Sequence, residues 1–277
     1  MSKIKDLYSF LEKHREYNRI TQNGFYQGLM QFDNPKDRVL SLLFSTVNTQ
    51  SQPRLDPLAE FWILIYKQLN KNPDCLNTLD EFINTISIDL DKKDLDRTQD
   101  LGKLDKLWHL LSLRKGWGNK TAALFVKACC NIHWDDANNG IIFWKDFPDK
   151  KVVNKIYLPV DRVIVHIFSR LKIDSIAKGD QFEKINIYLQ EHYKNPKEML
   201  VWDDLWFWGF ITQKSIKNDC LLEWNFAKYY AVFHAPKDEK SISKIKTLAE
   251  EFIKIIEADK ILIESQQLAT RKSQDIF

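Results

Sequence analysis

Glycine and proline are scarce in this chain, and their scarcity limits the folds that it can adopt. The sequence has 277 residues and only eight of each, together about 6% where about 12% is usual. A β-sandwich or β-barrel needs turn residues at short intervals, and a dinucleotide-binding fold needs glycine-rich loops. Long helices joined by short connections need few of either, and the length is ample for a large core. We therefore expect an all-α fold.

Apolar residues recur at helical spacing along most of the chain. They predict helices over 37–47, 58–69, 103–113, 120–130, 162–171, 181–192, 203–213, 221–233 and 238–267. The helical period is lost over 131–158, where two short strands or extended segments are expected.

The positive charge is concentrated in one segment. The net charge is only +3, but eleven Lys or Arg residues and five acidic ones lie between Arg114 and Lys172. This segment therefore carries a net charge of +6, and the rest of the chain −3. Such an excess is typical of a surface that faces phosphates.

No metal site or membrane span is expected. The four cysteines show no Cys-x-x-Cys pair, and the histidines show no ligand spacing. No run approaches the eighteen apolar residues that a membrane span needs, and the N-terminus lacks the apolar core of a signal peptide. These features favour a cytoplasmic protein.

Two short segments carry candidate chemistry. Between two predicted helices lies Arg114-Lys115-Gly116-Trp117-Gly118-Asn119, followed by Lys120 and Thr121. Because glycine has no Cβ, such a turn can approach a phosphate closely, with the amides of the next helix facing the anion. The second segment is Leu158-Pro159-Val160-Asp161-Arg162, which leads into an apolar helix with Asp161 at its N-cap. Alone, the first could be a tight turn and the second a helix cap.

Together the two segments resemble those of the helix-hairpin-helix DNA glycosylases, the superfamily of endonuclease III and the 8-oxoguanine glycosylases. The resemblance spans about residues 30–230 in element order and includes the apolar helix before Gln50, which the family places beside the DNA. It implies that Lys120 is the catalytic lysine and Asp161 the catalytic aspartate. It also implies two helical subdomains with the active site in the cleft between them.

Three departures from the family pattern are visible. Arg114 and Lys115 stand where family hairpins usually have Leu-Pro, and Trp117 stands at the fourth place of the hairpin. Lys120 and Asp161 are 41 residues apart, roughly double the family separation. The four-cysteine iron–sulfur loop of endonuclease III is missing, which favours the cluster-free branches of the family.

The implied activity is base excision repair. The enzyme flips a damaged nucleotide out of the duplex, Lys120 attacks the sugar C1′ and expels the base, and the resulting Schiff base permits strand nicking as in an AP lyase. Asp161 stabilises the positive charge on the sugar. An oxidised purine such as 8-oxoguanine is the leading substrate. An alkylated base, an oxidised pyrimidine or a hypermodified phage base, the last in phage defence, stays open.

The resemblance and the charge pattern together assign the remaining residues. The residues expected to contact DNA are Gln50, Arg114, Lys115, Gly116, Trp117, Gly118, Asn119, Thr121 and Arg162. The residues expected to line the base pocket are Trp202, Trp206 and Trp208. We expect no cofactor and no iron–sulfur cluster, with at most a monovalent cation at the hairpin. The expected partner is double-stranded DNA with a damaged base, bound by a monomer associated with the nucleoid.

The expected organisation has three parts. Residues 32–132 form the central helical subdomain, 1–31 pack with 159–277 in the second, and 133–158 form an insert. The aromatic residues of the insert suggest a flap near the pocket or the DNA. Two other functions fit the same sequence. A non-catalytic DNA-binding protein would need the glycines but not Asp161, and a helical interaction protein would need neither segment, although the +6 segment counts against it.

Overall fold

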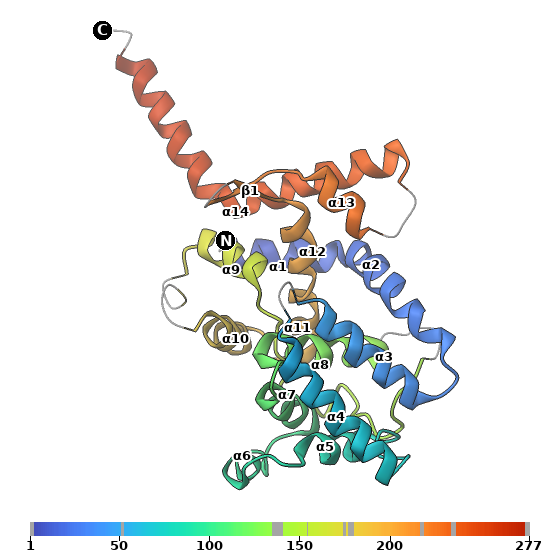
Figure 1. The fold of residues 1–277 in the computed structure, drawn as a ribbon. Coiled ribbons are helices and arrows are strands. Elements are labelled where there is room, and N and C mark those ends of the chain that lie inside the picture. The colour runs from blue at the N-terminus through green and yellow to red at the C-terminus, as the bar shows by residue number, and fades with distance from the viewer. Residues whose placement is uncertain are drawn as a thin grey trace. The chain divides into compact units, whose positions relative to one another are not determined.

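The computed structural model describes residues 3–50, 53–134, 141–153, 155–173, 176, 180–216, 219–233 and 237–274, with side chains up to residue 258. The all-α fold expected from the sequence is confirmed, and the described strands form one small sheet (Figure 1). The chain divides into two compact units. Unit 1 comprises Met1–Thr21, Arg162–Gln181 and Asp204–Phe277, and unit 2 comprises Gln22–Asp161 and Phe182–Asp203. Over the described residues, no helix is both long and apolar enough to cross a membrane.

Unit 1 is built around its first and last helices. It contains α1 (Lys3–Lys13), the start of α2 (Arg15–Gln27), α9 (Arg162–Arg170), α12 (Asp204–Ile211), α13 (Phe226–Val232) and α14 (Glu239–Gln274). Helix α1 packs on α14 and buries Ile4, Leu7 and Leu11, the face that helical spacing predicts. Asp204 at the start of α12 accepts hydrogen bonds from Arg15 Nε (3.0 Å) and Asn18 Nδ2 (2.6 Å).

A β-hairpin interrupts the predicted helices of unit 1. Strands β1 (Gln213–Ile216) and β2 (Asp219–Leu222) pair antiparallel, where the sequence predicted helices over 203–213 and 221–233. The Thr212 hydroxyl donates to the Trp208 carbonyl (2.7 Å) at the end of α12, and Asn225 Nδ2 donates to the Gln213 carbonyl (3.2 Å). The first bond is local to the end of α12, whereas the second joins the two ends of the hairpin, so helical periodicity does not reveal it.

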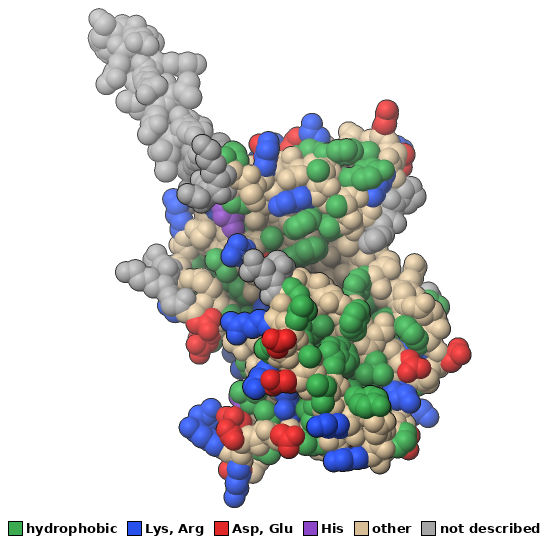
Figure 2. Space-filling model, in the orientation of Figure 1, with side chains coloured by type: hydrophobic (Ala, Val, Ile, Leu, Met, Phe, Trp, Pro, Cys, Tyr) green, Lys and Arg blue, Asp and Glu red, His purple; other side chains and the backbone are tan. Residues whose placement is uncertain are grey.

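Unit 2 contains the glycine turn that includes Gly116 and Gly118, and the two helices that this turn joins. Its elements are the rest of α2, η1 (Gly28–Gln31), α3 (Pro35–Asn48), α4 (Leu55–Lys71), α5 (Leu79–Ser87), α6 (Lys92–Asp96), α7 (Lys103–Leu113), α8 (Gly118–Trp134), α10 (Gln181–His192) and α11 (Pro196–Trp202). Helices α7 and α8 pack along each other, and α5 and α3 pack against this pair. Figure 2 shows apolar side chains gathered over α3 and α4. The large exposed apolar side chains of these two helices are Phe44, Leu55, Ile63 and Tyr66.

The boundaries of the units differ from those expected. The sequence predicts α10 and α11 in the same subdomain as the C-terminal segment, but in the structure they belong to unit 2. The Asn186 side chain of α10 bonds both the amide (2.7 Å) and the carbonyl (3.1 Å) of Leu158. Residues 22–31 also belong to unit 2, where Gln22 Nε2 donates to Asp203 (2.6 Å). Polar contacts between distant segments thus tie α10 and Gln22 to other parts of unit 2.

Described residues of the insert, which was expected to form a flap, contribute to the core of unit 2. Residues 135–140 and 154 lie outside the described residues, and the described remainder of the insert contains no strand. Phe143 and Trp144 are each 1% exposed, and Trp144 Nε1 donates to the Leu76 carbonyl (3.0 Å). Asp146 accepts from the amides of Leu79 (2.8 Å) and Asp80 (3.1 Å) at the start of α5. Replacing this segment by a short linker would therefore remove part of the core.

Candidate functional site

A tight turn over residues 114–117 joins α7 to α8. It is closed by a hydrogen bond from Trp117 N to Arg114 O (3.1 Å). Gly116 has φ 85° and Gly118 has φ 69°, a region that side chains with a Cβ disfavour. A Cβ on Gly116 would also lie 2.9 Å from the side chain of Leu58 on α4. Glycine at 116 is thus required both by the backbone conformation and by the approach of α4.

The turn is braced from the side that faces the core. Gln50, which follows α3, donates from Nε2 to the Gly116 carbonyl (3.0 Å). Trp117 is 4% exposed and packs edge to face on Phe61 (5.3 Å) and Phe125 (5.9 Å). Gln50 and Trp117 were both expected at the DNA. In the structure Gln50 holds the turn, and the buried indole of Trp117 belongs to the core.

The start of α8 is the exposed side of this turn. Gly118 and Asn119 are exposed, Lys120 is half-buried and Thr121 is buried. The first amides of a helix have no acceptor within the helix, and the helix dipole adds partial positive charge there. Together with the open space around Gly118, this makes the start of α8 suitable for binding a phosphate.

Several cations of the +6 segment have partners within the protein. Arg114 donates from Nε to the Ile86 carbonyl (2.8 Å) and from Nη2 to the carbonyls of Ile86 and Ile88, and it thus caps the end of α5. Lys115 forms an exposed ion pair with Glu60 (2.8 Å). Lys127 is buried and pairs with Asp203 (3.0 Å). Part of the positive charge therefore stabilises the fold rather than facing solvent.

Asp161 lies at the end of an extended segment that is fixed to α10. Leu158 is held by Asn186, and the next two residues, Pro159 and Val160, are buried. Asp161 itself is half-buried and directly precedes α9, the N-cap position predicted from the sequence. Arg162, the first residue of α9, is exposed.

Two aromatic rings bring this segment to the start of α8. Trp108 on α7 donates from Nε1 to the Asn119 carbonyl (3.2 Å), and the Tyr157 ring stacks on Trp108 (centroids 3.8 Å apart). Asn119 immediately precedes Lys120, and Tyr157 lies four residues before Asp161. Segments about 40 residues apart in the sequence are thus brought into one region of unit 2. No local pattern predicts this role for Trp108 or Tyr157, because the role depends on stacking between residues that are distant in the chain.

Two of the three tryptophans expected in the base pocket are unsuitable for it. Trp202 and Trp208 are fully buried, so neither ring has a free face on which a base could stack. Trp206 is half-buried, and its ring stacks on Phe210 (5.0 Å). Of the three, only Trp206 remains a candidate for stacking on a base, because the other two rings are buried in the core.

Comparisons with known proteins give no identity for this chain. No protein-family model, curated protein or solved structure matches it. Among the described residues, no group of three or more His, Cys, Asp or Glu side chains is arranged to hold a metal ion, and the four cysteines are free thiols. The function is therefore inferred from the glycine turn, Lys120 and Asp161.

Proposed function

We propose that this chain is a helix-hairpin-helix DNA glycosylase that removes a damaged base from duplex DNA and nicks the strand as an AP lyase. The observation that supports this most is the link from Asn119 through Trp108 to Tyr157. This link supports the proposal because it joins the residue before Lys120 to Tyr157, four residues before Asp161. An amine, a carboxylate and a phosphate-binding helix start are the groups that this chemistry requires.

Each group has a defined role in the proposed reaction. The amides at the start of α8 bind a backbone phosphate while the damaged nucleotide is flipped out. Lys120 Nζ forms a bond to C1′, the bond from C1′ to the base breaks, and the base leaves with a proton. Asp161 stabilises the positive charge on the sugar, accepts the proton that the attacking amine loses and passes it to the departing base. The imine that forms on ring opening then permits loss of the 3′ phosphate by β-elimination.

An oxidised purine such as 8-oxoguanine is the leading substrate. The sequence lacks the four-cysteine loop of the cluster-bearing branch and has a lysine at position 120, as in the cluster-free lyases that it resembles. Such an enzyme would act on the DNA of the nucleoid. A panel of duplexes that carry single oxidised, alkylated or hypermodified bases identifies the substrate by the base released.

Borohydride trapping tests the reaction class. An imine between Lys120 and the opened sugar is reduced to a stable amine, so the protein with lesion duplex and borohydride should give a covalent protein–DNA band. Lys120→Gln should abolish both the band and the nick while binding to duplex persists. Lys115→Gln is the matched control, because Lys115 is exposed and close in sequence. Lys127 is unsuitable, because its loss leaves the buried Asp203 carboxylate without a cation.

The other outcomes separate the remaining functions. A band that persists in Lys120→Gln places the nucleophile elsewhere. Release of free base without trapping indicates a monofunctional glycosylase. Duplex binding without release of any base indicates a non-catalytic DNA-binding protein.

A further inference from the structure

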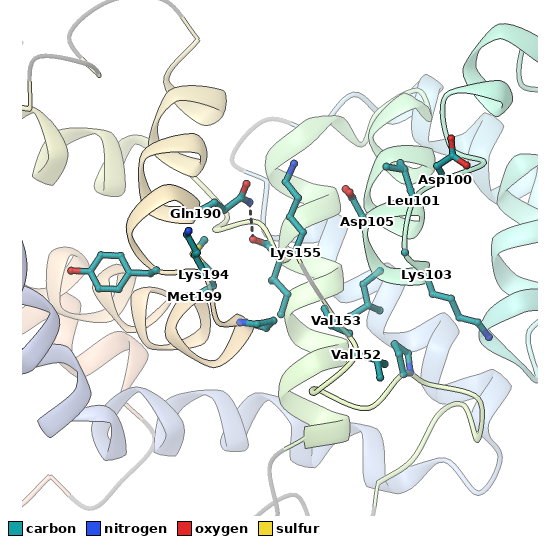
Figure 3. Close-up of a pocket in the computed structure, with 16 residues that line it drawn as sticks. Asp100, Leu101, Lys103, Asp105, Val152, Val153, Lys155, Gln190, Lys194 and Met199 are labelled. Carbon is teal, nitrogen blue, oxygen red and sulfur yellow. Dashed lines mark hydrogen bonds between the residues drawn. The ribbon is translucent and has the colours of Figure 1, made fainter.

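A pocket of about 660 Å³ lies at the N-terminal end of α7. It is lined by residues 100–105, by Pro148, Val152, Val153, Lys155 and Ile156 of the insert, and by the end of α10 with the start of α11 (Figure 3). All of its lining residues belong to unit 2. Neither Lys120 nor Asp161 lines the pocket, and the glycine turn is at the other end of α7. The pocket is therefore separate from the proposed active site.

Beside Lys103, the pocket is lined by two further lysines and by the carboxylates of Asp100 and Asp105. Lys155 lies over the Tyr157 ring (4.7 Å), and Lys194 follows α10 and is exposed. Over the part of the chain that the structure describes, neither ammonium group forms an ion pair. Lys103 differs, because Asp80 (2.7 Å) and Asp146 (3.3 Å) hold its ammonium group. Two unpaired ammonium groups in one pocket favour an anionic ligand.

The first turn of α7 combines a helix dipole with a carboxylate, so it adds no clear preference for an anion. Its N-cap residue is Gly102, and no side chain caps this end of the helix. The helix dipole contributes partial positive charge to the wall that carries residues 100–105, but Asp105 in the same turn and Asp100 just before it carry negative charge there. The preference for an anion therefore depends on Lys155 and Lys194.

The rest of the lining suits a flat organic group. Val153, Ile156 and Met199 supply apolar surface. Gln190 is fixed by a bond from its Nε2 to the Ile156 carbonyl (3.1 Å), as Figure 3 shows, which leaves its Oε1 as an acceptor. Asp105 is oriented by the Tyr157 hydroxyl (3.0 Å). Acceptor oxygens beside an apolar wall match the N–H groups of a nucleobase and do not match a plain hydrocarbon acid.

We propose that this pocket binds a nucleoside monophosphate, with the phosphate between Lys155 and Lys194 and the base against Val153, Ile156 and Met199. The volume is in the range of small-molecule sites, about 300–1,000 Å³. This binding site is independent of the proposed glycosylase activity, and its test involves no DNA.

Calorimetric titration of the full chain tests the site. The four common nucleoside 5′-monophosphates are the probes, and at least one should bind saturably with one site per chain. The corresponding nucleoside and inorganic phosphate should each bind at least tenfold more weakly, because each lacks one half of the recognised group. Equal affinity for the nucleoside would show that the lysines bind no phosphate and would overturn the proposal.

Matched lysine variants locate the binding. Lys155→Met and Lys194→Met should each weaken binding at least tenfold. Lys197→Met should leave it unchanged, because Lys197 is exposed on α11 and does not line the pocket. Thermal unfolding checks that each variant is folded, and exposed Lys194 gives a test that does not depend on the tolerance of position 155. Absence of binding by all four nucleotides, or undiminished binding in both pocket variants, refutes the proposal.

Discussion

At the residue scale, a substitution of Asp161 tests whether this residue is a catalytic carboxylate or only a helix cap. Asparagine keeps the size and the capping ability of aspartate, so Asp161→Asn should change the free energy of unfolding by less than about 0.5 kcal/mol. It removes the negative charge that would stabilise the sugar cation, so turnover should fall at least a hundredfold while duplex binding persists. Single-turnover base release and urea unfolding measure the two effects. Turnover close to that of the wild type would leave Asp161 with a capping role only.

Arg114 and Lys115 are neighbours in the sequence with different tasks. Arg114→Ala removes the cap of α5 and leaves the carbonyls of Ile86 and Ile88 without their charged donor. We expect a loss of about 2 kcal/mol in the free energy of unfolding. Lys115→Ala breaks only an exposed ion pair and should cost less than about 0.5 kcal/mol. Urea denaturation of both variants checks the contrast, and equal stability of the two would contradict the assigned cap.

At the scale of elements, the two glycines of the α7–α8 turn are under different constraints. Gly116→Ala meets both an unfavourable φ and the Leu58 side chain, so it should destabilise the protein by about 3 kcal/mol. Gly118→Ala meets only the unfavourable φ, because the space around Gly118 is open, and should cost about 1 kcal/mol. Denaturant midpoints measure both values. If Gly118→Ala lowered the free energy of unfolding more than Gly116→Ala, the contact between Leu58 of α4 and the turn would be contradicted.

At the scale of the whole molecule, a half-buried histidine of the insert makes the free energy of unfolding depend on pH. The His133 ring stacks on Phe147 (4.0 Å), and burial lowers its pKa to about 4. Between pH 6.5 and about 4 the unfolded chain binds a proton at His133 that the folded chain does not. The titration of His133 therefore has no effect on the free energy of unfolding above pH 6.5, and it lowers that free energy by up to about 3 kcal/mol as the pH falls. Urea unfolding at pH 7.5 and 5.0 should show the loss, and His133→Leu should reduce it.

Much of the fold and part of the candidate site follow from local sequence. The scarcity of glycine and proline and the helical spacing predict α7, α8 and α10 close to their observed bounds. The turn with Gly116 and Gly118 and the N-cap position of Asp161 are also predicted, because turns and caps depend on residues within a few positions of one another.

Other features depend on contacts between residues that are far apart in the chain. Arg114 caps a helix 26–28 residues earlier, and Trp117 and Trp202 are buried by neighbours that no local pattern identifies. The insert joins the core through Trp144, 68 residues from Leu76. The link between Asn119 and Tyr157 through Trp108 is of the same kind. Local periodicity records which face of a segment is apolar, whereas the partner of that face is chosen by packing and by the need to satisfy buried polar groups.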